Sequence, residues 1–444
     1  MSNRISLLGA GLTGPLLAVY LARRGHTVDL YERRPDMRVQ DVGGGRSINL
    51  ALSTRGLRAL AEVGLQDQVL ADAIRMPGRM IHALDGSLDF QPYGKEGEAI
   101  NSISRSGLNI ILLNAAERAG VRVHFNARCE SVSLKERTAT LVNDQTGERT
   151  TIAPERLIAA DGANSSLRAA MEKELPGFDS RTEWLEHGYK ELEIPPAPNG
   201  GFLMEPNALH IWPRHEFMMI ALPNPNGTFT CTVFAAFDGE DGFDTVLTDD
   251  EVMGYFQRHF PDAIPLMPTL LEDWGRNPTS RLGTVFCGPW HLDDWGLLIG
   301  DAAHAIVPFY GQGMNCCFED CFVLDTLLAE SRDWGSIMPQ FYALRKPNAD
   351  AIARLAVANF FEMRSRVVDP NYLRKKSIEA RLQQLFPDRW MPLYGMVTFS
   401  TIGYAEALRR SGEQDALLER VGFDAVEAAL QEGRESAEKT LWEK

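Results

Sequence analysis

The sequence predicts a mixed fold, α/β in its first part and α+β as a whole: a Rossmann-like nucleotide-binding domain, a second domain built on an antiparallel sheet, and helices at the C-terminus. Three observations predict it. A glycine motif at residues 9–14 stands between a strand-like run and an apolar helix, strand signals dominate residues 181–275, and the pattern is helical from about residue 339. With 444 residues, the chain is long enough for two or three domains.

The first motif, Gly9-Ala10-Gly11-Leu12-Thr13-Gly14, has the spacing of a dinucleotide-binding loop. It follows the apolar run at residues 5–8 and opens a helix at residues 15–24. Its glycines allow a tight turn and a close approach of backbone to pyrophosphate. A second strand is expected at residues 26–31, and it leads to Glu32, where an acidic side chain usually holds a ribose hydroxyl. Alone, this motif would also fit a nicotinamide-binding Rossmann domain.

Two further motifs decide between these cofactors. Asp161-Gly162 follows an apolar run, and Gly300-Asp301 follows a buried strand expected at residues 297–299. A nicotinamide-binding domain is complete within about 150 residues, so it does not require the Asp-Gly and Gly-Asp pairs farther along the chain. A cofactor that is bound along its whole length would contact all three motifs. The sequence therefore indicates a tightly but non-covalently bound FAD.

The third motif continues into a segment suited to a flat ligand. Residues 308–315 (PFYGQGMN) lead into a helix expected to run to about Glu330. Gly311 and Gly313 let the backbone approach the ligand, and the positive end of the helix points toward it. A reduced flavin is negatively charged along one ring edge, so this loop is suited to stabilise it. For His304, just upstream, ordinary packing is the expected role.

Strand and helix signals divide the chain into discontinuous parts. We expect the FAD-binding domain at residues 1–72, 97–180 and 276–338, the substrate-binding sheet domain at residues 73–96 and 181–275, and a helical region at residues 339–444. Turn clusters at residues 195–201 and 223–227 separate strands of a sheet that we expect to roof a pocket. The last helices are expected at residues 405–410, 415–420, 424–430 and 432–444.

Composition excludes several functions. The net charge of −15 argues against nucleic acid and against an anionic membrane surface as partners. No apolar run reaches the roughly 18 residues of a membrane span, and glycines interrupt the apolar N-terminal stretch, so we expect a soluble, cytoplasmic protein. The six cysteines are then expected to be reduced thiols. Cys316, Cys317 and Cys321 share one helix at a spacing that fits no zinc pattern, so no metal site is expected.

With these motifs the chain resembles the class A flavoprotein aromatic hydroxylases, and within that family the members that hydroxylate L-kynurenine. The three motifs above carry the broader resemblance. The narrower one rests on residues 45–53 (GRSINLALS), 76–82 (MPGRMIH), 92–94 (PYG), 102–105 (SISR), 307–315 (VPFYGQGMN) and 392–400 (PLYGMVTFS). The match extends from residue 9 to about residue 404, roughly nine-tenths of the chain.

The resemblance implies the chemistry. FAD reduced by NADPH, a transient co-substrate, would react with O2 to a C4a-hydroperoxide that hydroxylates L-kynurenine to 3-hydroxykynurenine, a step of tryptophan catabolism. The aniline nitrogen already activates the ortho carbon, so no catalytic acid or base is expected from the protein, which supplies geometry and a dry pocket. The sequence does not decide between NADPH and NADH, nor the oligomeric state, for which a homodimer is one alternative.

For the substrate, the resemblance places the amino-acid carboxylate against Arg79 and Tyr93, with Asn359 and Tyr394 contributing from the C-terminal helices. Arginine offers a forked pair of donors that matches a carboxylate, and tyrosine adds a donor without charge. The other expected pocket residues are Met218, Leu222, Phe234, Pro308, Phe309 and Tyr310. Of these, Tyr310 departs from the family, which generally has Phe or His there.

Residues 79–93 are expected to form a hairpin that turns at Asp85-Gly86. Side chains alternate along strands, so the length of its loop decides whether Arg79 and Tyr93 share a face. A three-residue loop, Asp85-Gly86-Ser87, would place them directly opposite each other on one face. We therefore expect an odd loop or a bulge.

For FAD, the resemblance implies contacts from the three motifs and from the segments around them. Arg105 is expected to be a cation beside the pyrophosphate or the flavin edge, and Cys129 to act through its backbone. The expected set is Gly9, Gly11, Thr13, Gly14, Tyr31, Glu32, Arg33, Arg34, Ala51, Arg105, Cys129, Ser166, Asp301, Gly313, Met314 and Asn315.

Two alternatives stay open. The same flavin chemistry could act on another aromatic acid, which Arg79 with Tyr93 argues against and Tyr310 leaves open. A flavin-binding regulatory protein without turnover is the other, although it would not need a roofed pocket with a placed arginine. The chain also departs from the eukaryotic members of the family, which carry a hydrophobic C-terminal anchor, because residues 405–444 are polar.

Overall fold

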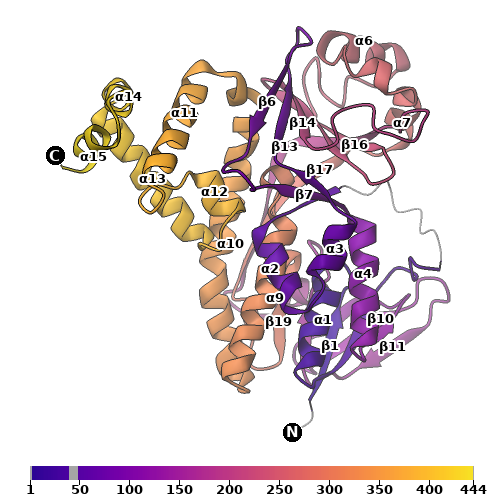
Figure 1. The fold of residues 1–444 in the computed structure, drawn as a ribbon. Coiled ribbons are helices and arrows are strands. Elements are labelled where there is room, and N and C mark those ends of the chain that lie inside the picture. Colours follow the sequence, from indigo (N-terminus) through magenta and orange to yellow (C-terminus); the bar gives the residue numbers. More distant parts are fainter. Residues whose placement is uncertain (1–2, 40–48, 444) are drawn as a thin grey trace.

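The structure is a computed structural model that describes residues 3–39 and 49–443 (Figure 1). Residues 45–48 of the segment at 45–53 therefore lie outside the described residues. Two large sheets organise the rest. A six-stranded sheet with helices around it holds the N-terminal motifs, and a seven-stranded sheet lies above it in Figure 1.

The six-stranded sheet has the order β18-β19-β12-β1-β2-β8, and all neighbours are parallel except β18 and β19. Its strands are β1 (Arg4–Leu8), β2 (Thr27–Tyr31), β8 (Arg122–His124), β12 (Leu157–Ala159), β18 (His291–Leu292) and β19 (Gly296–Leu298). The central strands are apolar runs because helices cover both faces of such a sheet. The three motifs follow β1, β12 and β19, which are adjacent. Their carboxyl ends therefore bring the motifs to one edge.

Helices follow or flank these strands. They are α1 (Thr13–Arg23), α2 (Thr54–Glu62), α3 (Gln66–Ala71), α4 (Arg105–Arg118), α5 (Ser166–Glu174), α8 (Asp301–His304) and α9 (Gly313–Glu330). Two three-stranded sheets complete this part, with orders β3-β7-β4 and β11-β10-β9. Their strands are β3 (Asn49–Leu52), β4 (Ile74–Met76), β7 (Ile100–Ser104), β9 (Arg128–Ser133), β10 (Thr138–Val142) and β11 (Arg149–Ile152).

The seven-stranded sheet has the order β17-β13-β16-β15-β14-β5-β6, antiparallel except where β14 meets β5. Its strands are β5 (Gly78–His82), β6 (Leu88–Pro92), β13 (Asp179–Ile194), β14 (Leu209–Arg214), β15 (Phe217–Pro223), β16 (Phe229–Ala236) and β17 (Ser280–Gly288). One face packs against α6 (Asp249–His259), the 3-10 turn η1 (Ile264–Leu266) and α7 (Leu270–Arg276). Residues 181–275 thus contain helices beside the strands that their strand signals indicate. Thr248 and Glu251 form a capping box that starts α6, a signal present in the sequence.

The hairpin of β5 and β6 corrects the expected register. Its loop has three residues, but they are 84–86, because the backbone N–H groups of Ala83 and Gly86 bond to the oxygens of Ser87 and Ala83, respectively. Arg79 is therefore opposite Gln91, not Tyr93. Tyr93 lies two residues beyond Gln91 and so on the same face as Arg79, as the odd loop requires. The two side chains meet diagonally, with the guanidinium carbon 6.0 Å from the ring centre.

The C-terminal region is helical. It contains α10 (Trp334–Ser365), the turn η3 (Arg366–Val368), α11 (Pro370–Leu385), α12 (Leu393–Thr398), α13 (Tyr404–Val421), α14 (Phe423–Glu432) and α15 (Arg434–Trp442). The helices expected at residues 405–410 and 415–420 are in fact one, α13. In Figure 1 the yellow helices α13 to α15 lie on the side of α10 away from α1. Across the part of the chain that the structure describes, no helix is long and apolar enough to cross a membrane.

Candidate active site

The glycines of the first motif fit tightly against the second motif. A Cβ at Gly9 would lie 2.6 Å from the oxygen of Ala160, and one at Gly14 would lie 1.9 Å from the oxygen of Gly9. At Gly11, in contrast, no described residue lies within 4 Å of such a Cβ. Two of the glycines thus pack the loop against protein backbone, while Gly11 leaves an open side along which a pyrophosphate can approach.

Two helices present uncapped N-termini at this edge. In the described structure, neither Leu12 before α1 nor Gln312 before α9 caps its helix through a side-chain hydrogen bond. The first N–H groups of a helix are usually satisfied by a cap, by water or by a ligand, and together with the helix dipole they favour an anion. A pyrophosphate and a reduced flavin ring are both negatively charged, so both would be stabilised at such helix ends.

The acidic residues of the site have different surroundings. Glu32, after β2, accepts hydrogen bonds from the backbone N–H groups of Ala10 and Arg34 at 2.8 and 3.0 Å, so it also braces the glycine loop. Asp161 accepts from the N–H of Ser166 through one oxygen, while its other oxygen is buried and has no hydrogen-bond partner in the described part of the chain. Burial raises the pKa of Asp161 above its ordinary value. A buried oxygen left without a partner at this edge suits a hydroxyl of a nucleotide.

The loop before α9 is held by Asn315. Its carbonyl oxygen accepts from the N–H of Ser53 at 2.9 Å, and its amide donates to the oxygens of Ala51 and Gly311, each at 2.8 Å. Gly311 has a φ of 64°, which favours glycine. The amide of Asn315 is fully used within the protein. Its side chain therefore shapes the loop, and any contact with a cofactor is left to its backbone.

A buried charge network lies behind this loop. His304 contacts Asp320 at 2.6 Å, and Arg345 bonds to Asp320 and Glu319, also at 2.6 Å. Burial raises the pKa of Asp320, but its partners His304 and Arg345 hold it below the ordinary range. His304, Asp320 and Cys316 could group around a metal ion, but the guanidinium of Arg345 already lies there, 3.5 Å from the sulfur of Cys316. The arrangement is that of a neutralised ion-pair network.

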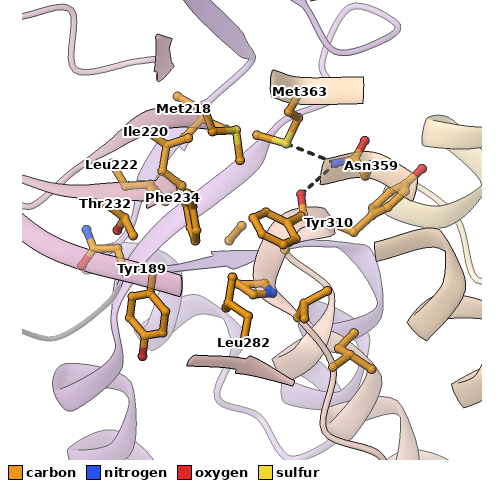
Figure 2. Close-up of a pocket in the computed structure, with 18 of the residues that line it drawn as sticks. Tyr189, Met218, Ile220, Leu222, Thr232, Phe234, Leu282, Tyr310, Asn359 and Met363 are labelled. Atoms are coloured by element: carbon orange, nitrogen blue, oxygen red, sulfur yellow. Dashed lines mark hydrogen bonds between the residues drawn. The ribbon is translucent and has the colours of Figure 1, made fainter. Parts of the chain in front are cut away.

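A cavity of about 320 Å³ lies between the seven-stranded sheet, the turn η2 (Pro308–Tyr310) and α10 (Figure 2). All ten residues expected at the substrate line it: Arg79, Tyr93, Met218, Leu222, Phe234, Pro308, Phe309, Tyr310, Asn359 and Tyr394. They come from five separate segments. Met218 and Phe234 are cross-strand partners on β15 and β16, and Figure 2 shows both turned toward the cavity.

The polar end of this cavity centres on Arg79, which is half-buried. Among the described residues, none places a carboxylate in an ion pair with it. Burial opposes its charge, yet the nearby Tyr372, Tyr93 and Glu362 raise the pKa of Arg79 above its ordinary value. Glu362 itself accepts a hydrogen bond from Tyr372. Arg79 is thus a cation at the wall of a cavity whose lining is mostly apolar but also includes Arg281.

Three tyrosines stack beside Arg79. The rings of Tyr93 and Tyr394 are 5.1 Å apart and nearly parallel, and Tyr394 and Tyr310 follow at 5.6 Å. Tyr394 belongs to α12 and Tyr310 to η2, so the stack joins the hairpin to the loop before α9. The hydroxyl of Tyr93 is buried and has no hydrogen-bond partner of good geometry among the described residues. It is available to a ligand.

The hydrogen bonds of Asn359 determine which way its side-chain amide faces. Its amide nitrogen donates to the oxygen of Phe309 at 2.7 Å and contacts the sulfur of Met363 at 3.2 Å, the two dashed lines of Figure 2. A backbone carbonyl can only accept, so the atom facing Phe309 must be the nitrogen. The carbonyl oxygen of Asn359 is left for a ligand, and it accepts hydrogen bonds rather than donating them.

Comparison with known proteins identifies the family. The chain is 48% identical over 437 residues to a kynurenine 3-monooxygenase of Xanthomonas axonopodis pv. citri (strain 306), with 96% of each chain covered. It is also 48% identical over 418 residues to the kynurenine 3-monooxygenase of Myxococcus xanthus (strain DK1622), covering 94% of this chain and 90% of that one. The chain belongs to the kynurenine 3-monooxygenase family. The resemblance found in the sequence is confirmed.

Membership of the kynurenine 3-monooxygenase family makes the chain an FAD-dependent monooxygenase. The family model described as FAD binding domain matches residues 4–338, which excludes the alternative of a nicotinamide-binding Rossmann domain. A solved structure, the tetrameric form of 2-methyl-3-hydroxypyridine-5-carboxylic acid oxygenase, superposes with a TM-score of 0.67 at 21% identity, over 84% of this chain and 95% of that one. This likeness confirms the expected fold.

The residues present fit an FAD. The open side of Gly11, the uncapped ends of α1 and α9 and the orphaned oxygen of Asp161 lie at one edge. Ser166 starts α5 and donates its hydroxyl to the oxygen of Cys129, so these two expected contacts lie together. Arg105 starts α4 at the end of β7 and is exposed. The remaining expected residues, Tyr31, Arg33, Arg34, Ala51, Asp301, Gly313 and Met314, lie on the motif loops or beside them.

Sequence reasoning missed part of the cavity wall. Tyr189, Ile220, Thr232, Leu282 and Met363 also line it, and all are labelled in Figure 2. Ile220 lies between Met218 and Leu222 on β15, so strand alternation alone would have found it. Tyr189 and Thr232 share the face through cross-strand pairs with Phe234 and Ile220. Those pairings come from the register of the sheet, which the sequence does not carry locally.

Proposed function

We propose that this member of the family hydroxylates the ring of L-kynurenine to 3-hydroxykynurenine, with FAD as cofactor and NADPH and O2 as co-substrates. The observation that carries this proposal is Arg79: a cation without a carboxylate partner among the described residues, at the wall of a mostly apolar cavity beside Tyr93. An aromatic amino acid supplies both the missing carboxylate and the apolar ring.

The substrate's amino-acid end is assigned to the polar end of the cavity. Arg79 and the hydroxyl of Tyr93 donate to the carboxylate. The carbonyl oxygen of Asn359 accepts from the ammonium group, since its amide nitrogen is held by Phe309. This differs from the role expected from the resemblance, in which Asn359 contributes to carboxylate binding.

The substrate's ring is assigned to the apolar wall made by Met218, Leu222 and Phe234, across from η2. When bound, the flavin supplies the activation of oxygen and its transfer to the ring. The chain supplies the rest. Its apolar wall excludes water, Arg79 fixes the direction in which the ring extends, and the end of α9 places positive potential beside the loop. No acid or base of the protein is assigned to the reaction.

We propose that the FAD is held by the residues expected from the sequence, with two refinements. Asn315 acts by shaping the loop, as argued from its three hydrogen bonds, and Asp161 joins the set through its orphaned oxygen. Gly11 takes the pyrophosphate, and Glu32 combines a ribose contact with bracing of the glycine loop.

The experiment is substrate-stimulated oxidation of NADPH by the FAD-loaded enzyme, with identification of the aromatic product. L-kynurenine should stimulate oxidation and give 3-hydroxykynurenine. Stimulation by another aromatic acid, with none by L-kynurenine, would overturn the substrate assignment while keeping the chemistry. The phenol of Tyr310 at the cavity is the feature that would favour that outcome. Running NADH in parallel decides the co-substrate.

A further inference from the structure

The hairpin that carries Arg79 is weakly attached to its sheet. Only three residue pairs of a parallel ladder join β5 to β14, from Leu209 opposite Arg79 to Ile211 opposite Ile81. Strand β6 is the edge of the sheet, and its side chains Leu88 and Phe90 are exposed. The position of Arg79 therefore depends on side-chain contacts that hold the hairpin in place.

Such contacts exist on the face of the sheet turned away from the cavity. Side chains alternate, so His82 and His210 point opposite to Arg79 and Ile211. Both histidines are buried, at 5% and 2% exposure. The two rings are joined by a contact of 2.8 Å between Nε2 of His82 and Nδ1 of His210, which bridges β5 to β14.

This bridge continues at both ends, and we call the whole the imidazole chain. Nδ1 of His82 lies 2.9 Å from a carboxylate oxygen of Asp262, and Nε2 of His210 lies 2.8 Å from the backbone oxygen of Glu205. Trp212 stacks on His82 at 3.8 Å and donates to the same oxygen of Asp262. Arg214 donates to the backbone oxygen of His82.

The contacts of the imidazole chain determine which ring nitrogens carry hydrogens. The oxygen of Glu205 only accepts, so Nε2 of His210 carries a hydrogen and its Nδ1 is an acceptor. Nε2 of His82 must then donate. Nδ1 of His82 faces a carboxylate, and it must also donate if Asp262 is ionised. Both ring nitrogens of His82 thus carry hydrogens, which makes it an imidazolium.

The neighbouring groups agree with this assignment. Burial raises the pKa of Asp262, but hydrogen bonds from His82 and Trp212 bring it below its ordinary value, so this carboxylate is ionised. Burial and the neighbouring His82 lower the pKa of His210 to about 4, so this ring is neutral. Arg214 also faces the imidazole chain, and its side chain donates to the backbone oxygens of His82, Pro213 and His259.

We propose that His82, an imidazolium held between Asp262 and His210, is a positioning residue that fixes the β5–β6 hairpin and so places Arg79 for the substrate. His82 does not line the cavity. This inference rests on the proposed function only for the measurement of L-kynurenine affinity. Hydrogen exchange of the hairpin tests the structural part independently.

The test compares His82→Gln with His259→Gln in the FAD-loaded enzyme. His259 is the matched control, since its contact with Asp241, at 3.0 Å, is also a histidine–carboxylate pair but does not involve the hairpin. His82→Gln should keep its FAD, exchange the backbone amides of β5 and β6 faster, and bind L-kynurenine about two- to tenfold more weakly with kcat less affected. His259→Gln should match the unmodified enzyme.

A second measurement concerns the proton. Nitrogen-15 spectra of the unmodified enzyme should show an N–H group on each ring nitrogen of His82, as its two hydrogen bonds require. Asp262→Asn, which removes the anion, serves if His82→Gln does not fold, and should also speed exchange in the hairpin. Unchanged exchange and affinity, or a single N–H on His82 at pH 6, would overturn the proposal. Failure of the unmodified enzyme to bind L-kynurenine would overturn the proposed function instead, leaving the exchange result valid.

Discussion

At the scale of single residues, the polar groups of the site differ in how far the protein uses them. The amide of Asn315 has three partners inside the chain, and that of Asn359 has its nitrogen occupied and its oxygen free for a ligand. Arg79 has a raised pKa and no carboxylate in an ion pair among the described residues. Groups with unused hydrogen-bonding capacity in a cavity mark where a ligand binds.

Arg79→Ala should leave the fold and the bound FAD intact and weaken L-kynurenine binding. A hydrogen bond to a charged group contributes about 1.5–3 kcal/mol, so the dissociation constant should rise about ten- to a hundredfold. Titration monitored by flavin absorbance measures it. An analogue without the carboxylate is the control, because the deleted contact is one that it never makes. Equal affinity of both enzymes for L-kynurenine would exclude Arg79 as the carboxylate partner.

Asp301→Ala should weaken retention of FAD, because Asp301 opens α8 at the edge where the three motifs meet. Flavin released on gel filtration or dilution measures the loss. Asp294→Ala is the control. Asp294 is exposed, lies before β19 and forms a surface ion pair with Arg137 at 3.7 Å, which contributes little to stability. Full retention by Asp301→Ala would remove this residue from the cofactor site.

At the scale of elements, the sequence predicts what local patterns encode. The strands β1, β2 and β19 and the helix α9 were predicted because apolar runs and glycine breaks mark them. The hairpin register was off by one residue on each strand, since the loop begins at Leu84 and not at Asp85. The ten expected cavity residues lie together, but Tyr189 and Thr232 were missed because only strand pairing brings them to the same wall.

Close packing between two elements can be tested at Gly9. It has a φ of 92°, and a Cβ there would meet the backbone of Ala160 and Asp161 at 2.6–2.7 Å. Gly9→Ala should therefore destabilise the fold and lose FAD, from αL strain of about 1–2 kcal/mol plus overpacking of about 1–3 kcal/mol. Gly25 has a φ of 84° and nothing within 4 Å, so Gly25→Ala should show the strain alone and keep its FAD. Denaturant unfolding and flavin content measure both. Equal losses in the two variants would contradict the tight contact between the motifs.

At the scale of the whole molecule, the site depends on parts far apart in the chain. The cavity combines β5 and β6, the sheet strands β15 and β16, the loop before α9 and the helices α10 and α12. Motifs and strand signals predicted the FAD-binding domain and the substrate-binding sheet separately. The way in which they enclose a single cavity follows from long-range packing, to which no local pattern corresponds. Charges buried in this packing make stability depend on pH.

Glu191 on β13 gives the sharpest case, because it is half-buried and its pKa rises to about 7 through burial, with Arg105 opposing the shift. In the unfolded chain a glutamate titrates near 4.5. Between these values the folded state binds more protons than the unfolded state, so stability should fall as pH rises through this window and level off above it.

Glu191→Gln removes this titration. The Tm of the variant, with FAD saturating, should rise relative to the unmodified protein between pH 4.5 and pH 7.5. The gain should be about 1–2 °C, since solvent screens a half-buried group and a chain of this size responds weakly to one interaction. Glu186→Gln, at an exposed position of the same strand, controls for loss of one negative charge. A difference in Tm between variant and unmodified protein that stays constant across this pH range would show that Glu191 titrates normally in the folded state, and that the sheet beside the cavity is more hydrated there than its packing implies.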